Sequence, residues 1–166
     1  MRVGIGYDIH RFKKRGGVLT LGGVRIPHAR GLDGHSDADV LLHAITDALL
    51  GAIGAPDLGE LFPPSDAQWR DADSRVFLKR AERLVRRAGF RIGNLDAVIV
   101  ADAPKLSPHK AAIRRSIGRL LKVPASSVSL KGKTTEGFAP GKHGIAAQAV
   151  VLLTQGQGKK RSRRRT

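Results

Sequence analysis

Residues 36–55, SDADVLLHAITDALLGAIGA, constrain the fold of this chain more than any other segment. The pattern predicts a helix with Ser36 as its N-cap and with Asp37 and Asp39 in the first turn, where carboxylates complement the helix dipole. Apolar residues are so numerous that most of the circumference of this helix should be buried. The segment therefore predicts a globular domain with a substantial core.

Shorter patterns place this helix in an α+β domain. Residues 2–12, RVGIGYDIHRF, alternate as a strand does when successive side chains point to opposite faces. Residues 18–27 predict two short strands joined by a Gly-Gly turn. Further strands are predicted at residues 95–101, 126–133 and 144–154, amphipathic helices at 71–90 and 108–123, and a loop at 55–66. We expect one α+β domain over residues 1–155, with the helices packed on one face of a mixed β-sheet.

The composition narrows the chemistry of any functional site. With 166 residues, 41% of them hydrophobic, the chain fits one ordinary domain with a proper core. The absence of cysteine excludes disulfides, thiolate zinc sites and cysteine nucleophiles, so a metal would be held by histidine and carboxylate. No apolar run approaches the roughly 20 residues that span a bilayer, and the N-terminus lacks a signal-peptide pattern. These absences predict a cytoplasmic protein with no membrane contact.

The net charge of +16 is concentrated partly at the C-terminus. Residues 156–166, GQGKKRSRRRT, contain six lysine and arginine residues, no acidic residue and no apolar residue to bury. This tail is predicted to be disordered, and it could bind nucleic acid or an acidic partner without specificity. A solvated appendage without a function is the alternative. The rest of the chain is also basic, which suits an anionic substrate.

Asp8 and His10 stand two residues apart in the first predicted strand, so they should share a face, about 6–7 Å apart along the chain. His43 lies on the apolar helix, with Asp39 and Asp47 one turn away on either side. Two histidines and a carboxylate are an ordinary ligand set for catalytic zinc, and Asp39 or Asp47 would orient the ring of His43 from a second shell. The alternative is that Asp8 and His10 merely pair and that His43 is a half-buried, hydrogen-bonded histidine.

Two glycine-containing segments raise other possibilities. Gly4 and Gly6 do not form a dinucleotide-binding loop, because the third glycine is absent and no crossover helix follows. Residues 131–138, KGKTTEGF, could bind phosphate oxygens through lysine and threonine and a hard cation through Glu136. An ordinary polar loop after a strand is the alternative for this segment.

Seven motifs resemble those of one known family. They follow one another in the same order as in that family, from residue 1 to about residue 154. They are GYDIH, LGGVRIP, GLDGHSDADVLLHAITDALLGA, DLGELFPPSD, DSRVFL, ADAPKLSPH and KTTE. The chain resembles the 2-C-methyl-D-erythritol 2,4-cyclodiphosphate synthases, which are lyases of the non-mevalonate isoprenoid pathway. The resemblance implies a homotrimer with active sites between adjacent subunits.

The resemblance also implies a reaction and its metals. The 2-phosphate of 4-diphosphocytidyl-2-C-methyl-D-erythritol 2-phosphate attacks the β-phosphate, which forms the cyclic diphosphate and expels CMP. Asp8, His10 and His43 would hold zinc, and Glu136 would carry magnesium or manganese together with the substrate diphosphate. His35 and Thr134 would stabilise the transition state.

Substrate contacts follow from the same resemblance. Residues 101–107 match a cytosine pocket supplied by the neighbouring subunit, and residues 133–136 match a diphosphate-binding segment. Lys133 replaces the usual threonine, and the following loop is two residues shorter than usual, with Lys142 in place of an arginine. The matching positions are Asp8, Ile9, His10, His35, Ser36, Asp57, Leu58, Gly59, Phe62, Pro63, Pro64, Ser65, Asp66, Ala101, Asp102, Ala103, Pro104, Lys105, Leu106, Ser107, Lys133, Thr134, Thr135, Glu136, Phe138 and Lys142.

Other interpretations are weaker. A basic nucleic-acid-binding module would explain the tail, but only 4% of residues are aromatic, which leaves little for base stacking. A zinc phosphohydrolase would use the same ligands with water as the nucleophile and would give an open diphosphate. The start at Met1 argues against a fragment of a bifunctional cytidylyltransferase–cyclase, and the intact ligand set argues against a degenerate homologue.

Overall fold

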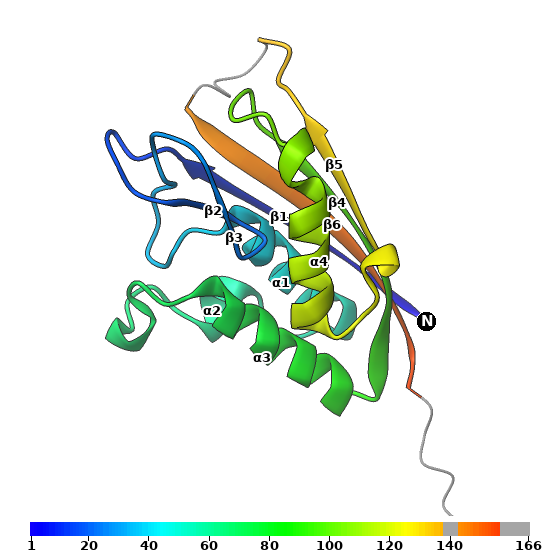
Figure 1. Cartoon of the computed structure of the whole chain (residues 1–166). Helices are drawn as coiled ribbons and strands as arrows, with labels where there is room; N and C mark the ends of the chain where they lie inside the picture. Colours follow the sequence, from blue (N-terminus) through cyan, green and yellow to red (C-terminus); the bar gives the residue numbers. More distant parts are fainter. Residues whose placement is uncertain (138–142, 157–166) are drawn as a thin grey trace, which may run out of the picture.

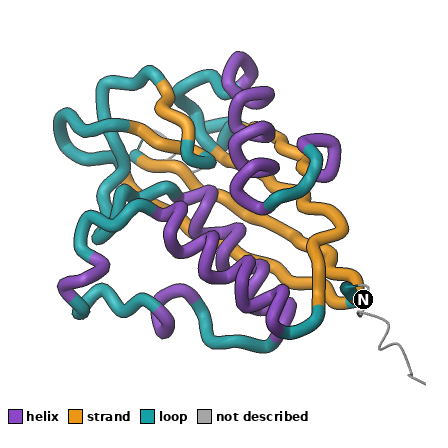
Figure 2. Tube along the Cα trace, turned by 60° about the horizontal axis from the view of Figure 1, so that its bottom comes forward, coloured by secondary structure: helices purple, strands orange, loops and turns teal. Residues whose placement is uncertain are grey.

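A mixed four-stranded sheet forms one layer of the molecule, and the helices cover one of its faces (Figure 1). The computed structural model describes residues 1–137 and 143–156. Figure 2 shows the helices lying against one side of the strands. The elements are β1 (Arg2–Arg11), β2 (Leu19–Leu21), β3 (Val24–Ile26), α1 (Val40–Ile53), α2 (Leu58–Leu61), α3 (Ser74–Arg87), β4 (Phe90–Val100), α4 (Lys110–Leu121), β5 (Val128–Lys133) and β6 (Gly144–Gln155), with 3₁₀ turns at Ala67–Trp69, Ser107–His109 and Ala125–Ser127.

The sheet has the strand order β1-β6-β4-β5. β6 pairs antiparallel with both β1 and β4, whereas β4 and β5 run parallel, so the sheet is mixed as predicted. β2 and β3 form the predicted separate hairpin, whose Gly22 and Gly23 have φ angles of 62° and 73°. Such positive φ angles at both turn residues are those of a tight hairpin turn that glycine adopts without strain. The prediction of one α+β domain is confirmed.

Helix α1 lies at the centre of the core. Eleven of its fourteen residues are buried, because the helix packs against β1 and β6 on one side and α3 on another. This confirms the near-complete burial expected from its apolar sequence. In α3 the apolar side chains of Phe77, Leu78, Ala81 and Val85 form the buried face, while the arginines and lysines of the same helix are exposed. Because α1 is buried on most of its circumference, its residue His43 lies in the interior.

The start of α1 differs from the prediction, which placed the N-cap at Ser36. The helix begins at Val40, and Asp39 is the N-cap, with its Oδ1 accepting a hydrogen bond from the backbone N–H of Leu42 at 3.1 Å. Ala38 has a φ of 56°, a left-handed conformation that an α-helix cannot include. The Ser36 hydroxyl accepts a hydrogen bond from the N–H of Ala38 at 3.1 Å and so stabilises a turn before the helix. Asp37 and Asp39 consequently do not lie in the first turn of α1.

Asp39 also anchors the β2–β3 hairpin to the helix. Its two carboxylate oxygens accept hydrogen bonds from the N–H groups of Gly22 at 2.9 Å and Gly23 at 2.7 Å. Burial raises the pKa of Asp39 to about 6, against the opposing effect of these backbone donors. One carboxylate thus joins two elements that are far apart in the sequence.

The loop predicted at residues 55–66 contains a short helix that the sequence pattern did not indicate. Asp57 is the N-cap of α2, and its side chain accepts a hydrogen bond from the N–H of Glu60 at 2.8 Å. Asp47 of α1 accepts a hydrogen bond from the N–H of Leu58 at 2.8 Å, which ties α2 to the central helix. Within residues 1–137 and 143–156 no helix is long and apolar enough to cross a membrane.

Candidate metal centre

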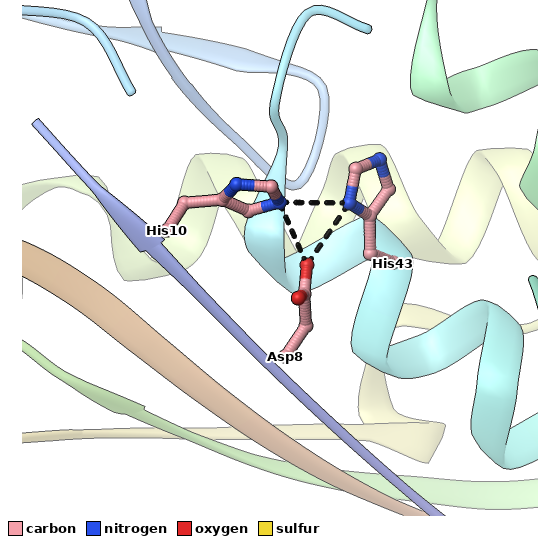
Figure 3. A group of neighbouring side chains, drawn as sticks. All are labelled: Asp8, His10 and His43. Atoms are coloured by element: carbon pink, nitrogen blue, oxygen red, sulfur yellow. Dashed lines mark hydrogen bonds and ion pairs between the residues drawn. The ribbon is translucent and has the colours of Figure 1, made fainter. Parts of the chain in front are cut away.

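Asp8, His10 and His43 meet at one point between β1 and α1 (Figure 3). Asp8 Oδ2 lies 2.9 Å from both His10 Nε2 and His43 Nδ1, and the two ring nitrogens lie 3.2 Å apart. The alternation of β1 turns Asp8 and His10 toward the same face, as predicted, and α1 presents His43 to that face. The structure therefore brings together three side chains that could act as metal ligands.

The other nitrogen of each imidazole is held by a hydrogen bond outside the group. His10 Nδ1 lies 2.8 Å from the carbonyl oxygen of Asp33, so this nitrogen carries a proton, and Nε2 is the nitrogen that faces the group. His43 Nε2 lies 2.8 Å from Ser74 Oγ and 3.2 Å from Ser36 Oγ. Both imidazoles are thus anchored at the nitrogen that faces away from Asp8.

Neither carboxylate that was predicted to orient His43 does so. The prediction rested on the positions of Asp39 and Asp47 one helical turn before and after His43. Asp39 is instead the N-cap, with its carboxylate turned to the β2–β3 hairpin, and Asp47 is turned to the N–H of Leu58. The prediction that Asp39 or Asp47 orients the ring of His43 is therefore wrong, and Ser74 contacts the outer nitrogen of that ring instead. No local spacing pointed to Ser74, because it lies 31 residues from His43.

The contacts between Asp8 and the two histidines favour the charged form of Asp8 and of His10. Burial by itself would raise the pKa of Asp8, but hydrogen bonds from His10 and His43 outweigh burial and hold this pKa well below its usual range. Burial would lower the pKa of His10, yet the hydrogen bond to Asp8 and the charge of Asp8 outweigh it and raise this pKa. Asp8 is consequently a carboxylate at neutral pH and accepts a hydrogen bond from each imidazole whose facing nitrogen is protonated.

The group fits a divalent cation. The three candidate ligand atoms lie within 4.8 Å of one another. Two imidazole nitrogens and a carboxylate oxygen converge on one point, with the far nitrogen of each ring already hydrogen-bonded, as is usual for metal-ligating histidine. Two histidines and one carboxylate are an ordinary zinc ligand set that leaves a coordination position for substrate.

A cavity of about 320 Å³ opens beside the three ligands. His35 and Ser36 line it, as do Asp57, the N-cap of α2, and the α2 residues Leu58 and Gly59. Phe62, Trp69 and Phe77 form an aromatic wall, with the rings of Phe62 and Phe77 4.6 Å apart. The predicted site residues on its surface are Asp8, His10, His35, Ser36, His43, Asp47, Asp57, Leu58, Gly59, Phe62 and Pro64.

Sequence reasoning missed Trp69 and Phe77. Trp69 lies on a 3₁₀ turn and Phe77 on the buried face of α3, where an aromatic residue reads as ordinary core. Their rings lie 5.8 Å apart at the cavity. Pro63, Ser65 and Asp66 belong to the same loop but are absent from the described lining of the cavity.

Ile9 is exposed on β1 and does not line the cavity. The predicted residues 101–107 and 133–136 gather elsewhere, at the carboxyl ends of the parallel strands β4 and β5. The Asp102 carboxylate accepts hydrogen bonds from the N–H of Thr135 at 2.8 Å and from its hydroxyl. Thr134 donates a hydrogen bond to Glu136. As far as the described residues go, neither residues 101–107 nor 133–136 line the cavity beside the ligands of the same chain. Phe138, Lys142 and residues 157–166 of the tail lie outside the described residues.

Fold and site together define a class: an α+β enzyme domain with a His₂–carboxylate group beside an open cavity. The chain belongs to the YgbB family, whose model matches residues 1–154.

Relatives with known names agree with this assignment. A 2-C-methyl-D-erythritol 2,4-cyclodiphosphate synthase of Shouchella clausii is 52% identical over 159 residues, which cover 95% of this chain and 99% of the relative. A bifunctional enzyme IspD/IspF of Novosphingobium aromaticivorans is 52% identical over 157 residues, and this chain spans 40% of its length. A solved structure of a 2C-methyl-D-erythritol-2,4-cyclodiphosphate synthase in a CDP-bound form has a TM-score of 0.86 at 44% identity, covering 92% of this chain and 100% of that one.

Proposed function

We propose that this chain converts 4-diphosphocytidyl-2-C-methyl-D-erythritol 2-phosphate to 2-C-methyl-D-erythritol 2,4-cyclodiphosphate with release of CMP. An oxygen of the 2-phosphate forms a bond to the β-phosphorus, and the bond between that phosphorus and the CMP oxygen breaks. The enzyme is then a phosphorus-oxygen lyase. The observation that carries the proposal is the group of Asp8, His10 and His43 beside a cavity, in a chain about half identical to synthases of this name.

The three ligands would hold zinc, which when bound supplies positive charge against the repulsion between the two phosphates of the substrate. His35 lines the same cavity and would donate a hydrogen bond to phosphate oxygen, which is electrostatic help of the oxyanion type. Asp57 and Gly59, which line the same cavity, would contact the ribose and erythritol region. Phosphoryl transfer needs positioning and charge neutralisation more than covalent help, so this set of residues suffices.

Thr134 and Glu136 would act at the diphosphate with a second divalent ion, magnesium or manganese. Glu136 supplies a carboxylate, the kind of ligand that these hard cations prefer, and Thr134 contacts it. Residues 101–107, beside them, would bind the cytosine. Support for a cytidine nucleotide comes from CDP, which is bound in related structures.

A homotrimer would bring these two groups of residues together across a subunit interface. The face of the sheet opposite the helices supports self-association, because it exposes large apolar side chains on neighbouring strands. Ile5 of β1 is 62% exposed and stands opposite Val150 of β6, which is 40% exposed. Val3, Tyr7 and Ile9 continue the same apolar row along β1. Analytical ultracentrifugation of the purified protein, with activity measured on each species, tests this assembly, and an active monomer would contradict it.

Phosphorus NMR tests the reaction itself. The purified protein is incubated with the diphosphocytidyl 2-phosphate substrate, zinc and magnesium, beside a His43→Ala variant. We expect CMP and a cyclic diphosphate with the wild type and unchanged substrate with the variant. An open-chain diphosphate would indicate a zinc phosphohydrolase instead. Unchanged substrate with folded, zinc-loaded wild type would overturn the proposal.

A further inference from the structure

We propose that the groove between α3 and α4 is a second binding site, which takes a short chain of phosphate groups such as inorganic triphosphate. The groove has a volume of about 530 Å³ and is lined by residues of α3, α4 and the turn of the β2–β3 hairpin. Its lining shares no residue with the cavity beside Asp8, His10 and His43. The proposal therefore concerns a different site and does not depend on the proposed reaction.

The groove is strongly basic. Among residues 1–137 and 143–156, its lining contains five lysine and arginine residues and one acidic residue, Glu82. Glu82 is buried and forms an ion pair with Arg86, so its charge is already compensated. All five cationic side chains are exposed, and they give the groove an uncompensated positive charge. They are Arg75, Lys79, Arg83, Arg119 and Lys122.

Two helices bring these cations to one place. Arg75, Lys79 and Arg83 follow one another four residues apart on α3, so they lie on one face about 6 Å apart along the helix axis. Arg119 lies in the last turn of α4 and Lys122 is its C-cap. Like charges four residues apart destabilise a helix, and here a second helix adds further positive charge. An anion bound between the helices would offset this repulsion.

Most of these cations are available to an anion. Within the described part of the chain Arg75 forms an ion pair with Asp73, and the other four cations of the groove form none. Arginine presents a planar fork of N–H donors that matches phosphate oxygens, and lysine presents a compact charge with three donors. Several donors can therefore reach several phosphate oxygens at once.

Ser116 supplies an independent sign of a ligand. This residue of α4 is 7% exposed and lines the groove, and its hydroxyl has no hydrogen-bond partner in the part of the chain that the structure describes. Every fully enclosed side-chain polar atom of the described residues has a partner, so the Ser116 Oγ reaches the open groove. A largely buried hydroxyl without a partner is costly, and an oxygen of a bound phosphate would satisfy it.

Gly23 keeps the approach to this hydroxyl open. A Cβ added to Gly23 would stand 3.2 Å from the Oγ of Ser116 and 3.4 Å from the Cδ of Arg75. A side chain at position 23 would therefore occupy the space beside both groups. The hairpin turn contributes backbone to the groove at the point where the unpartnered hydroxyl lies.

The shape and lining of the groove favour a small phosphate compound over a nucleic acid. Sites for small molecules typically have volumes of about 300–1,000 Å³, a range that includes this groove. Its described lining contains no aromatic residue on which a base could stack. The helices that form it cover one face of the sheet, and the proposed homotrimer uses the opposite face, so the groove would stay accessible in that assembly.

Isothermal titration calorimetry of the full chain with inorganic triphosphate tests the proposal. A chelator removes divalent cations, so that none can link triphosphate to the metal centre, and about 0.15 M salt screens scattered surface charges. We expect one triphosphate bound per chain. Arg83→Ala/Arg119→Ala should weaken binding at least about 10-fold, because it removes two charged hydrogen-bond donors. Ser116→Ala should weaken it about 2–10-fold with no change in charge.

Two controls locate the binding. Arg87→Ala/Arg115→Ala removes the same charge from exposed positions of the same two helices outside the groove, and it should bind as the wild type does. His43→Ala should also bind as the wild type does, and a loss in this variant would place the triphosphate at the metal centre and overturn the proposal.

The remaining outcomes are equally decisive. ATP is titrated beside triphosphate: equal affinity supports a site for the phosphate chain alone, and tighter binding of ATP supports a site for a nucleotide. No binding by the wild type would overturn the proposal, as would equal losses in the two double variants, which would indicate a diffuse effect of charge. Undiminished binding in Arg83→Ala/Arg119→Ala would place the anion elsewhere. A short DNA duplex that binds where triphosphate does not would show a nucleic-acid surface instead.

Discussion

Gly6 of β1 lies directly against Ala44 of α1: a Cβ added to Gly6 would stand 2.0 Å from the Ala44 carbonyl oxygen. Gly4, two residues earlier on the same face of the strand, approaches Ala48 equally closely. The strand and the central helix therefore touch backbone to backbone. Because His43 precedes Ala44 and Asp8 follows Gly6 by two residues, this contact brings the metal ligands of the two elements within reach of each other.

Gly6→Ala should move α1 away from β1 and weaken both the fold and the metal centre. The obstructing atoms are backbone, which cannot rotate aside, so we expect a loss of at least about 1–3 kcal/mol in the free energy of unfolding. Zinc affinity should fall as well, because His43 moves with the helix. Gly51→Ala is the control, since its added Cβ would meet its nearest atom at 3.8 Å, and it should gain up to about 1 kcal/mol. Urea denaturation and zinc titration measure both effects, and equal stability of the two variants would contradict the contact.

Asp39→Ala should destabilise the protein far more than Asp47→Ala. Asp39 accepts hydrogen bonds from three backbone donors, and its removal leaves the N–H groups of Gly22 and Gly23 without this acceptor. Loss of a cap and of buried acceptors predicts about 2–4 kcal/mol. Asp47 accepts one hydrogen bond, from Leu58, and its loss should cost about 1 kcal/mol. Denaturation midpoints of the two variants compare the effects, and the reverse order would contradict the anchoring role of Asp39.

The Asp8–His10 pair should give metal-free protein a window of extra stability in mildly acidic solution. The lowered pKa of Asp8 contributes stability that is present above the ordinary aspartate pKa and is lost as the pH falls through the folded value. The raised pKa of His10 contributes stability that is present below the ordinary histidine pKa and is lost as the pH rises through the folded value. Both contributions are complete between about pH 4 and pH 6.5.

The measurement is the unfolding free energy of wild type minus that of His10→Gln, in a chelator, across the pH range. Asp39 makes the same pH-dependent contribution to the unfolding free energy of both proteins, so this contribution cancels in the difference. We expect the difference to be largest in the mildly acidic window and to shrink on both sides. A difference that is independent of pH would contradict the pairing.

Zinc should stabilise the folded protein through the three ligands. A ligand that binds only the folded state at 100 times its dissociation constant adds about 2.7 kcal/mol. Thermal unfolding with zinc and with chelator should therefore differ for wild type and coincide for His43→Ala. His109→Ala, a histidine outside the group, should behave as wild type. Zinc stabilisation that survives in His43→Ala would place the metal elsewhere.

Local patterns in the sequence determined the elements and the candidate ligands. Alternation along residues 2–11 placed Asp8 and His10 on one face of a strand, and the apolar helix around His43 had to be central because it could not be solvated. The Gly-Gly dipeptide predicted the hairpin, since both residues need positive φ. These inferences depend only on residues close together in the chain, because hydrophobic periodicity and secondary-structure propensity are local properties of the sequence.

Only the tertiary structure decided where α1 begins and what holds His43. Ser36 and Asp39 are both good N-caps by sequence, and the choice fell to Asp39 because Gly22 and Gly23 of the hairpin supply donors to its carboxylate. The partner of His43 is Ser74, brought in by α3, and not either aspartate of its own helix. A hydrogen bond between distant segments leaves no periodic trace in the sequence, because its geometry exists only after the helices have packed.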